Sequence, residues 1–136
     1  MKRNVVFVCA GNTCRSPMAE FILRRRNPDF NVSSAGLMAA DGFPMSQHAQ
    51  VLLQAEGYPI EEIENFTSTF LSDEILAEDN EIYVMNNFIK QAIEDRGRRQ
   101  NVFLLGHDDI ADPFGQNLED YQMVKRIIEE AIEEKF

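Results

Sequence analysis

The chain has 136 residues, 44% of them hydrophobic, and a formal net charge of −10 at pH 7. This length suits one well-buried domain, residues 1–136, and is too short for two comfortable ones. The acidic balance argues against a nucleic acid or an anionic membrane as partner, because both need a basic surface. The N-terminal apolar run is too short to span a bilayer and lacks a cleavage site, so we expect a cytoplasmic protein.

The first predicted elements are a strand and a helix. Residues 4–10, NVVFVCA, form a continuous apolar run typical of a strand buried on both faces of a sheet. Ser16 followed by Pro17 predicts a helix start, with Ser16 as the N-cap and Pro17 at the first helical position. This helix runs to residue 26. The arginines at 24–26 in its last turn suit the negative end of the helix dipole better than a substrate patch.

The rest of the chain continues this alternation. Gly57 predicts the end of one helix, and Ser72 and Asn117 each precede an acidic first turn. The last helix carries one apolar stripe, made of Leu118, Tyr121, Val124, Ile128 and Ile132. In chain order the elements are a strand over 30–36, helices over 44–57 and 73–78, a strand over 81–85, a helix over 87–97, a strand over 101–105 and a helix over 118–134. Four strands among four or five helices predict an α/β fold with a four-stranded parallel sheet and helices on both faces.

The segment CAGNTCRS, residues 9–16, joins the first strand to the first helix. Ligands of parallel sheets bind at this carboxyl end of the strands. Gly11 and Asn12 are residue types that readily take positive φ, so the loop can curl and turn its amide N–H groups inward. Together with the positive end of a helix dipole, such amides bind an anion. We therefore expect a phosphate site made of Ala10, Gly11, Asn12, Thr13, Cys14 and Arg15.

The distribution of charge indicates the same region. Residues 1–26 carry six of the 13 basic residues against one acid, Glu20, a net charge of +5, whereas the rest of the chain sums to −15. An anion site is expected close to this N-terminal segment.

Cys9 has three interpretations. A plain buried cysteine would leave the spacing of Arg15 and Ser16 unexplained, and a zinc pair with Cys14 lacks further ligands at recognisable spacing. As a nucleophile, Cys9 would gain from the helix N-terminus and the nearby cation, which both favour a thiolate. Arg15 can clamp two phosphoryl oxygens with its planar fork, and Ser16 can donate to the sulfur. A nucleotide-binding loop is excluded because the Gly-Lys-Ser/Thr ending is missing.

A thiolate that attacks a phosphate ester displaces an oxygen, and a nearby acid must give this oxygen a proton. The segment HDDIADPFGQ after the last strand offers three aspartates. Taken alone, this segment would be a turn with solvated carboxylates. Its pairing with the cysteine loop favours Asp112, which the rigid Pro113 holds, as a general acid.

VCAGNTCRSPMAE near the N-terminus, SSAG at 33–36 and ADPFG before the last helix occur together in this chain. With these motifs and this element order the sequence resembles the low-molecular-weight protein tyrosine phosphatase family over essentially its whole length. The resemblance implies phosphomonoester hydrolysis without metal or cofactor, with phosphorylated proteins as substrates and inorganic phosphate as product. It implies Cys9 as nucleophile, Arg15 as phosphate clamp and Asp112 as general acid.

The resemblance also suggests supporting roles. Asn12 and Ser16 would hold the loop, with Ser34 as a hydrogen-bonding support for Asn12. Cys14 is a candidate redox partner, since a disulfide with Cys9 would protect the nucleophile from over-oxidation.

Thr13 and Phe114 are the candidate specificity residues. Many tyrosine-specific members of the family carry isoleucine at the position of Thr13, whereas threonine there and DPFG at the acid loop go together in bacterial arginine phosphatases. Phosphotyrosine is the predicted substrate, and phosphoarginine is the alternative. An arsenate reductase would need further cysteines after Cys14, which the chain lacks. A non-catalytic phosphoprotein-binding module would not need Cys9, Arg15 and Asp112 together.

Overall fold

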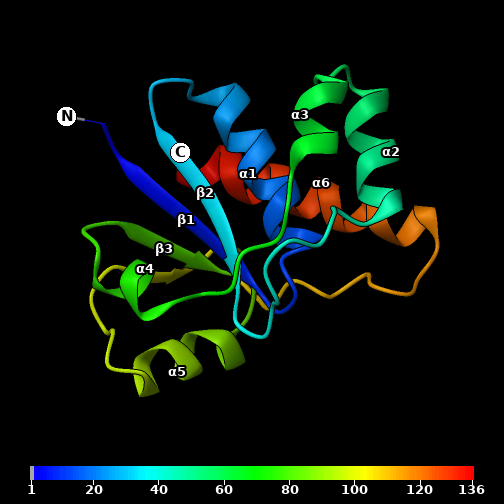
Figure 1. Ribbon diagram of the computed structural model, residues 1–136. Helices are drawn as coiled ribbons and strands as arrows, with labels where there is room; N and C mark the ends of the chain where they lie inside the picture. The colour runs from blue at the N-terminus through cyan, green and yellow to red at the C-terminus, as the bar shows by residue number, and fades with distance from the viewer. Residues whose placement is uncertain (1) are drawn as a thin grey trace.

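The computed structural model describes residues 2–136 and is built around β1 (Asn4–Cys9), as Figure 1 shows. All strand pairings are parallel, and the sheet order is β2-β1-β3-β4. The other strands are β2 (Asn31–Gly36), β3 (Glu81–Val84) and β4 (Val102–Leu104). The predicted α/β fold with a four-stranded parallel sheet is confirmed.

Helices cover both faces of this sheet, as predicted. They are α1 (Arg15–Arg26), α2 (Gln47–Ala55), α3 (Ile60–Asn65), α4 (Asp73–Ala77), α5 (Asn87–Asp95) and α6 (Leu118–Lys135). On one face α1 packs against β1 and β2, with α6 behind it, and on the other face α5 packs against β3 and β4. The short helix α3 was not predicted, because its acid-rich sequence buries only Ile63. None of the helices in the described residues is long and apolar enough to span a membrane.

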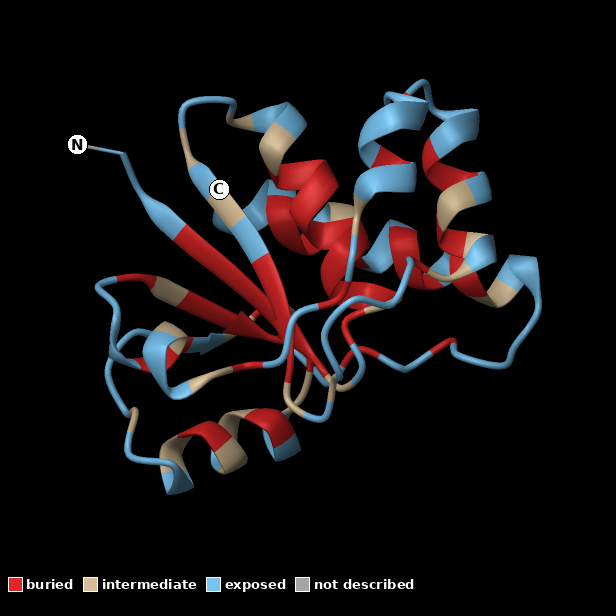
Figure 2. Cartoon of the chain, in the orientation of Figure 1, coloured by how far each residue is buried: buried red, intermediate tan, exposed pale blue. Residues whose placement is uncertain are grey.

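The core is centred on β1. Every residue of this strand after Asn4 is buried, as Figure 2 shows for the middle of the sheet. A parallel strand with a neighbour on each edge and a helix on each face has no side exposed to water, which explains its unbroken apolar sequence. β1 therefore holds Cys9 on a rigid support.

Several predicted helix ends are confirmed. The side chains of Ser72 and Asn117 each accept a hydrogen bond from a backbone N–H in the first turn of the helix that follows. Asn86, which was not singled out from the sequence, caps α5 in the same way. Gly57, just after α2, has a φ of 82°, which a glycine adopts without strain.

Two details of the predicted helices are wrong. Helix α1 begins at Arg15 with Cys14 at the cap position, so Ser16 is a helical residue and Pro17 still lies in the first turn, where no N–H is needed. The Ser16 hydroxyl bonds to other parts of the loop instead of capping the helix. In α6, Leu118 is exposed, whereas the other four members of the stripe are buried.

The strand order brings the cysteine loop to a point where ligands bind. From β1 the chain crosses to β2 on one side, and later returns to β3 on the other side of β1. In open parallel sheets, a crevice forms outside the strand ends where the winding direction changes. Cys9, the last residue of β1, lies at this crevice.

Candidate active site

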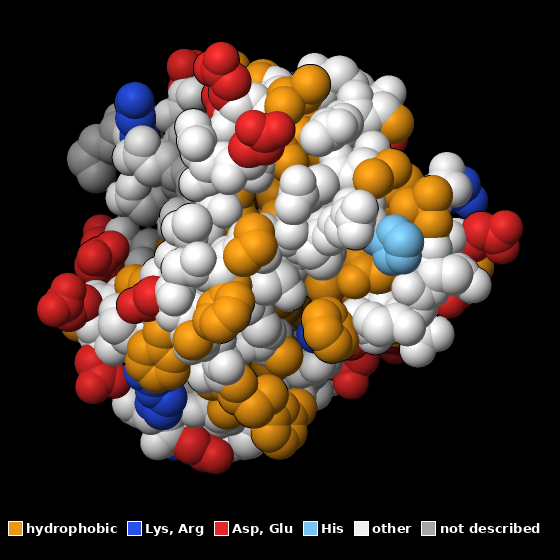
Figure 3. All heavy atoms as spheres, turned by 45° about the vertical axis from the view of Figure 1, so that its right-hand side comes forward, with side chains coloured by type: hydrophobic (Ala, Val, Ile, Leu, Met, Phe, Trp, Pro, Cys, Tyr) orange, Lys and Arg blue, Asp and Glu red, His pale blue; other side chains and the backbone are white. Residues whose placement is uncertain are grey.

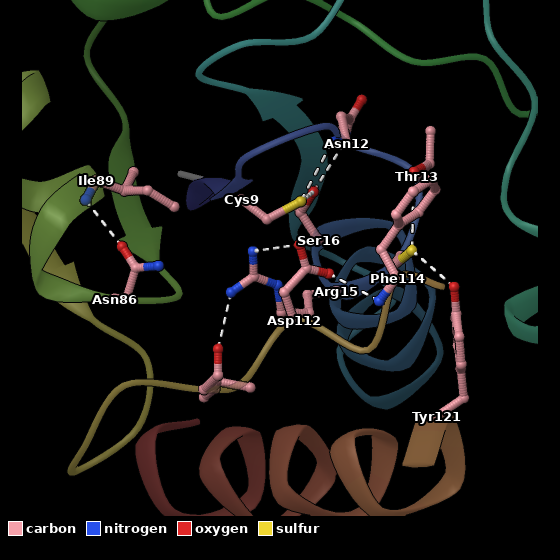
Figure 4. A network of polar contacts seen from close by, with 12 residues as sticks. Cys9, Asn12, Thr13, Arg15, Ser16, Asn86, Ile89, Asp112, Phe114 and Tyr121 are labelled. Atoms are coloured by element: carbon pink, nitrogen blue, oxygen red, sulfur yellow. Dashed lines mark hydrogen bonds and ion pairs between the residues drawn. The ribbon is translucent and has the colours of Figure 1, made fainter. Parts of the chain in front are cut away.

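The loop from Cys9 to Ser16 wraps over the carboxyl end of β1 and runs into the N-terminus of α1, as Figure 4 shows. Asn12 has a φ of 57°, the left-handed conformation that its sequence predicted. Gly11 does not take positive φ, contrary to expectation. A single left-handed residue is thus enough to make the loop curl.

The neighbouring strand end supports the loop through its backbone. Gly36 pairs with Cys9 at the end of β2, and the N–H groups of Leu37 and Met38 donate to the carbonyls of Cys9 and Ala10 at 2.9 Å. A Cβ atom at Gly36 would lie 2.7 Å from the Ala10 carbonyl oxygen and 2.9 Å from the Asn12 nitrogen. Only glycine permits this close approach.

We predict that Gly36→Ala lowers the free energy of unfolding by about 1–3 kcal/mol, because backbone atoms cannot move away from the new methyl group cheaply. The displaced loop should also lose much of its activity. Thermal unfolding and phosphatase assays measure both effects. Gly11→Ala is the stability control. A Cβ atom at Gly11 would lie 3.8 Å from its nearest neighbour, Thr13 Oγ1, which is an ordinary van der Waals distance. Equal unfolding curves for wild type and Gly36→Ala would contradict the prediction.

Cys9 is buried, and its sulfur receives two polar contacts from its own loop. The Ser16 hydroxyl oxygen lies 2.9 Å from Cys9 Sγ, and the Asn12 backbone N–H donates to the same sulfur at 3.2 Å. Both contacts come from the loop itself and fix the position of the sulfur.

The Asn12 side chain connects the loop to its surroundings. Its Nδ2 donates to Ser16 Oγ at 2.8 Å and to Ser34 Oγ at 2.9 Å, and its Oδ1 accepts from the Thr69 N–H at 2.8 Å. The loop-support residues named from the sequence therefore lie in contact. Thr69 was missed, because nothing in the sequence relates the segment before α4 to the loop.

Arg15 lies beneath the pocket and is 3% exposed. Its Nη1 donates to the Ile110 carbonyl at 2.7 Å, and its Nη2 lies 3.7 Å from Asp112 Oδ2. The Nε atom is buried and has no hydrogen-bond partner within residues 2–136. A buried donor without a partner is costly, so an oxyanion reaching this nitrogen would satisfy it.

Asp112 belongs to the loop between β4 and α6, and its side chain is half exposed. Its Oδ1 accepts from the Phe114 N–H at 3.0 Å, which fixes the carboxylate within its own turn. Its Oδ2 faces Arg15. Two loops more than 90 residues apart in sequence thus meet at one end of the sheet, as Figure 4 shows.

These residues enclose a cavity of about 270 Å³. Its lining consists of every residue from Cys9 to Arg15 except Asn12, together with Met38, Asp112 and Phe114. Met38 and Phe114 are 70% and 69% exposed, so the rim is apolar, and Figure 3 shows hydrophobic side chains gathered on one face of the molecule. Met38 was missed, although its place directly after β2, beside β1, was a usable signal.

Cys14 also lines the pocket, and it is not bonded to Cys9. Its sulfur lies 3.2 Å from the Tyr121 hydroxyl of α6. Burial, with a further contribution from the hydrogen bond to Cys14, raises the pKa of Tyr121 to about 12. The tyrosine therefore keeps its proton at neutral pH and can donate it to the sulfur. A disulfide between Cys14 and Cys9 stays a prediction.

The pocket is lined mainly by the N-terminal segment in which an anion site was predicted, but the arginine run contributes nothing to it. Arg3 pairs with Glu81, Arg24 pairs with Glu20 and Arg25 stacks on the Tyr58 ring. Arg15 alone of the early basic residues lines the pocket. Within residues 2–136, no three His, Cys, Asp or Glu side chains lie close enough together to hold a metal ion.

The fold and site define a class of protein: a parallel α/β domain with a cysteine in the loop after its central strand, and an arginine and an aspartate that face each other in the same pocket. A family model described as low molecular weight phosphotyrosine protein phosphatase matches residues 4–136. The chain belongs to this family.

Known relatives of both substrate types are similar to the chain. A protein-arginine-phosphatase of Bacillus subtilis is 33% identical, covering 95% of this chain and 91% of the relative. A probable low molecular weight protein-tyrosine-phosphatase, EpsP of Ralstonia nicotianae, is 32% identical, covering 98% of this chain and 93% of the relative. The structure of Vibrio vulnificus Wzb in complex with benzylphosphonate superposes with a TM-score of 0.89 at 27% identity, covering 98% of this chain and 97% of Wzb.

Proposed function

We propose that this chain hydrolyses phosphorylated protein side chains, with phosphotyrosine as substrate and a phosphocysteine at Cys9 as intermediate. The observation that carries the proposal is the floor of the pocket, where the Cys9 sulfur lies among donors beside the buried, unpartnered Nε of Arg15. A phosphoryl group above the sulfur would meet inward amides, a guanidinium and the start of a helix.

In the first step, Cys9 Sγ attacks phosphorus in line with the leaving oxygen. The S–P bond forms as the P–O bond to the side chain breaks, and Asp112 transfers its proton to that oxygen. Arg15 and the loop amides stabilise the charge on the equatorial oxygens. The half-exposed position of Asp112, facing Arg15 at the pocket edge, supports this role.

In the second step, water attacks phosphorus and the S–P bond breaks. Asp112, now ionised, accepts a proton from this water, and inorganic phosphate leaves. The thiolate is regenerated within reach of Ser16 and the Asn12 N–H. The chain would act as one domain over residues 1–136, in the cytoplasm, where Cys9 and Cys14 stay reduced.

Phosphoarginine is a second candidate substrate, favoured by one observation. Thr13 and Phe114, whose residue types go together in the arginine phosphatases, line the same pocket. The Thr13 hydroxyl, whose nearest sulfur is 3.7 Å away, can interact with a guanidinium, and Phe114 offers it a flat face. The similarity to relatives named as arginine phosphatases adds support.

The test compares phosphate release from matched phosphotyrosine and phosphoarginine peptides. If Thr13 recognises the guanidinium, Thr13→Ile should lower the rate on phosphoarginine relative to phosphotyrosine by about tenfold, because the hydroxyl contact is lost and the pocket narrows. If phosphotyrosine is the substrate, it should be the faster peptide in wild type and the ratio should change little. Hydrolysis of neither peptide would contradict the proposed function.

A further inference from the structure

The loops around the active-site pocket carry negative charge. The four loops that follow the strands are residues 10–14, 37–46, 85–86 and 105–117, and in a parallel sheet all of them lie at the same edge. They contain four aspartates, one histidine and no lysine or arginine, although the chain has 13 basic residues. Arg15, directly after the first of these loops, is buried. The surface that a substrate meets first is therefore acidic.

This charge determines which phosphorylated segments can approach the pocket easily. A phosphoryl group is anionic, so exposed carboxylates repel it at a distance and also repel acidic residues in the same segment. The repulsion becomes attraction when the segment carries positive charge beside its phosphoryl group. The acidic loops thus favour a basic segment over an acidic one.

On one side of the pocket, an exposed carboxylate and an exposed aromatic ring are held against the same segment, residues 68–70. The Phe70 N–H donates to Asp41 Oδ1 at 2.7 Å. The Phe43 N–H donates to Ser68 Oγ at 2.9 Å, and the Phe43 side chain is 58% exposed. Asp41 and Phe43 thus form an acid–aromatic pair on a fixed backbone.

A second acid–aromatic pair lies on the other side of β1. Asp109, in the loop after β4, accepts from the Asn87 N–H at 2.8 Å, and Phe88 follows Asn87 in the first turn of α5. The Phe88 side chain is 68% exposed. Because β2 and β3 flank β1 on opposite sides, as Figure 1 shows, the two pairs lie on opposite sides of the cysteine loop.

An aromatic ring beside a carboxylate suits a lysine or arginine side chain, because the ring face attracts the cation and the carboxylate pairs with it. The chain contains this arrangement internally. Arg96 lies 5.6 Å from the centroid of the Phe70 ring and pairs with Asp73 at 2.9 Å. Asp41 and Asp109, in contrast, form no ion pair within residues 2–136 and are available to a partner.

We propose that the pairs Asp41–Phe43 and Asp109–Phe88 bind basic residues of the substrate, one on each side of its phosphorylated residue. This inference rests on the proposed function. It specifies the substrate as a phosphorylated protein segment with lysine or arginine both before and after the phosphorylated residue.

The spacing of the basic residues follows from the positions of the two carboxylates along the chain. Asp41 and Asp109 each stand three residues from a residue that lines the pocket, Met38 and Asp112, and so lie within about 11 Å of it. An extended peptide covers this distance in about three residues. We therefore expect the basic residues about three positions from the phosphorylated one.

The experiment measures peptide affinity by calorimetry on Cys9→Ser, which binds without turnover. Phosphotyrosine peptides carry arginine, glutamine or glutamate at the third position before and after the phosphorylated residue, and phosphoarginine peptides form a second series. We expect the arginine peptide to bind about tenfold more tightly than the glutamine peptide, and the glutamate peptide to bind most weakly. About 0.5 M salt should remove most of this preference, because exposed charges are screened.

Asp41→Asn and Asp109→Asn, each made in the Cys9→Ser protein, assign the two sides. Asparagine keeps an oxygen that can accept the same backbone N–H but loses the charge. With peptides that carry arginine on one side only, each variant should lose the preference on one side and keep it on the other. The matched control replaces Asp29 and Asp79 by asparagine. Both are exposed and precede β2 and β3, at the opposite edge of the sheet, so the preference should remain.

Equal affinities for the three peptides, a preference unchanged by salt, loss of one and the same side in both variants, or loss of the preference in the control would overturn the inference. Hydrolysis by wild type, measured separately, tests the proposed function. Wild type that hydrolyses all three peptides equally well, with equal affinities in Cys9→Ser, would refute the inference alone. Preferential binding of the arginine peptide without hydrolysis of any peptide would count against the proposed function alone.

Discussion

Cys9→Ser should lower kcat/KM by at least about 10⁴-fold, the scale of loss found when a covalent nucleophile is removed. A serine hydroxyl is far less ionised than a thiol at neutral pH, so it is a much weaker nucleophile. Its neighbours Ser16 and the Asn12 N–H would contact the new oxygen as they contact the sulfur. The measurement is steady-state hydrolysis of the preferred phosphopeptide.

The same variant provides its own control. Because the loop, Arg15 and the helix N-terminus are unchanged, Cys9→Ser should still bind inorganic phosphate with the affinity of the wild type, within a few fold. Calorimetry measures this binding. Retained phosphate binding with lost turnover would assign the defect to chemistry, whereas activity within tenfold of wild type would refute a covalent role for Cys9.

Asp112→Asn should lower kcat by about 10²–10⁴-fold, the usual contribution of a general acid. The asparagine keeps the size of the side chain and can still accept from the Phe114 N–H, but it carries no proton to transfer. The loss should be greatest for leaving groups of high pKa and small for activated aryl phosphates, which need no proton. Rates across a series of aryl phosphates test this dependence.

Asp108→Asn is the matched control for that variant. Asp108 lies on the same loop after β4 and carries the same charge, but it is outside the pocket lining. Its substitution should leave both the rate and the dependence on the leaving group unchanged. An Asp112→Asn enzyme whose loss is the same for every leaving group would contradict proton transfer by Asp112.

The parallel sheet was predictable because its signal is local. The apolar run of β1 reflects burial on both faces, and the alternation of strands with helices leaves few other architectures. Ser72 and Asn117 have short polar side chains at helix starts, and they cap those helices as their chemistry suggests. Ser16 shows the limit of this reasoning, because its hydroxyl is used by Cys9 and Asn12 in the folded loop.

The residues of the pocket and their supporting contacts were predictable only where they belong to a recognisable sequence motif. Cys9, Arg15 and Asp112 stand in recognisable sequence contexts, and the structure brings them to one pocket. Thr69 and the Ile110 carbonyl act through backbone atoms, which carry no sequence signal.

The most direct test of the account is to trap the phosphorylated enzyme. Wild type and Asp112→Asn are mixed with excess substrate, quenched in acid within the first turnovers and analysed by intact mass and peptide mapping. The account predicts one phosphoryl group per chain, attached to Cys9 and absent from Cys9→Ser. Full turnover with no covalent phosphate on the chain, or with phosphate on another residue, would contradict it.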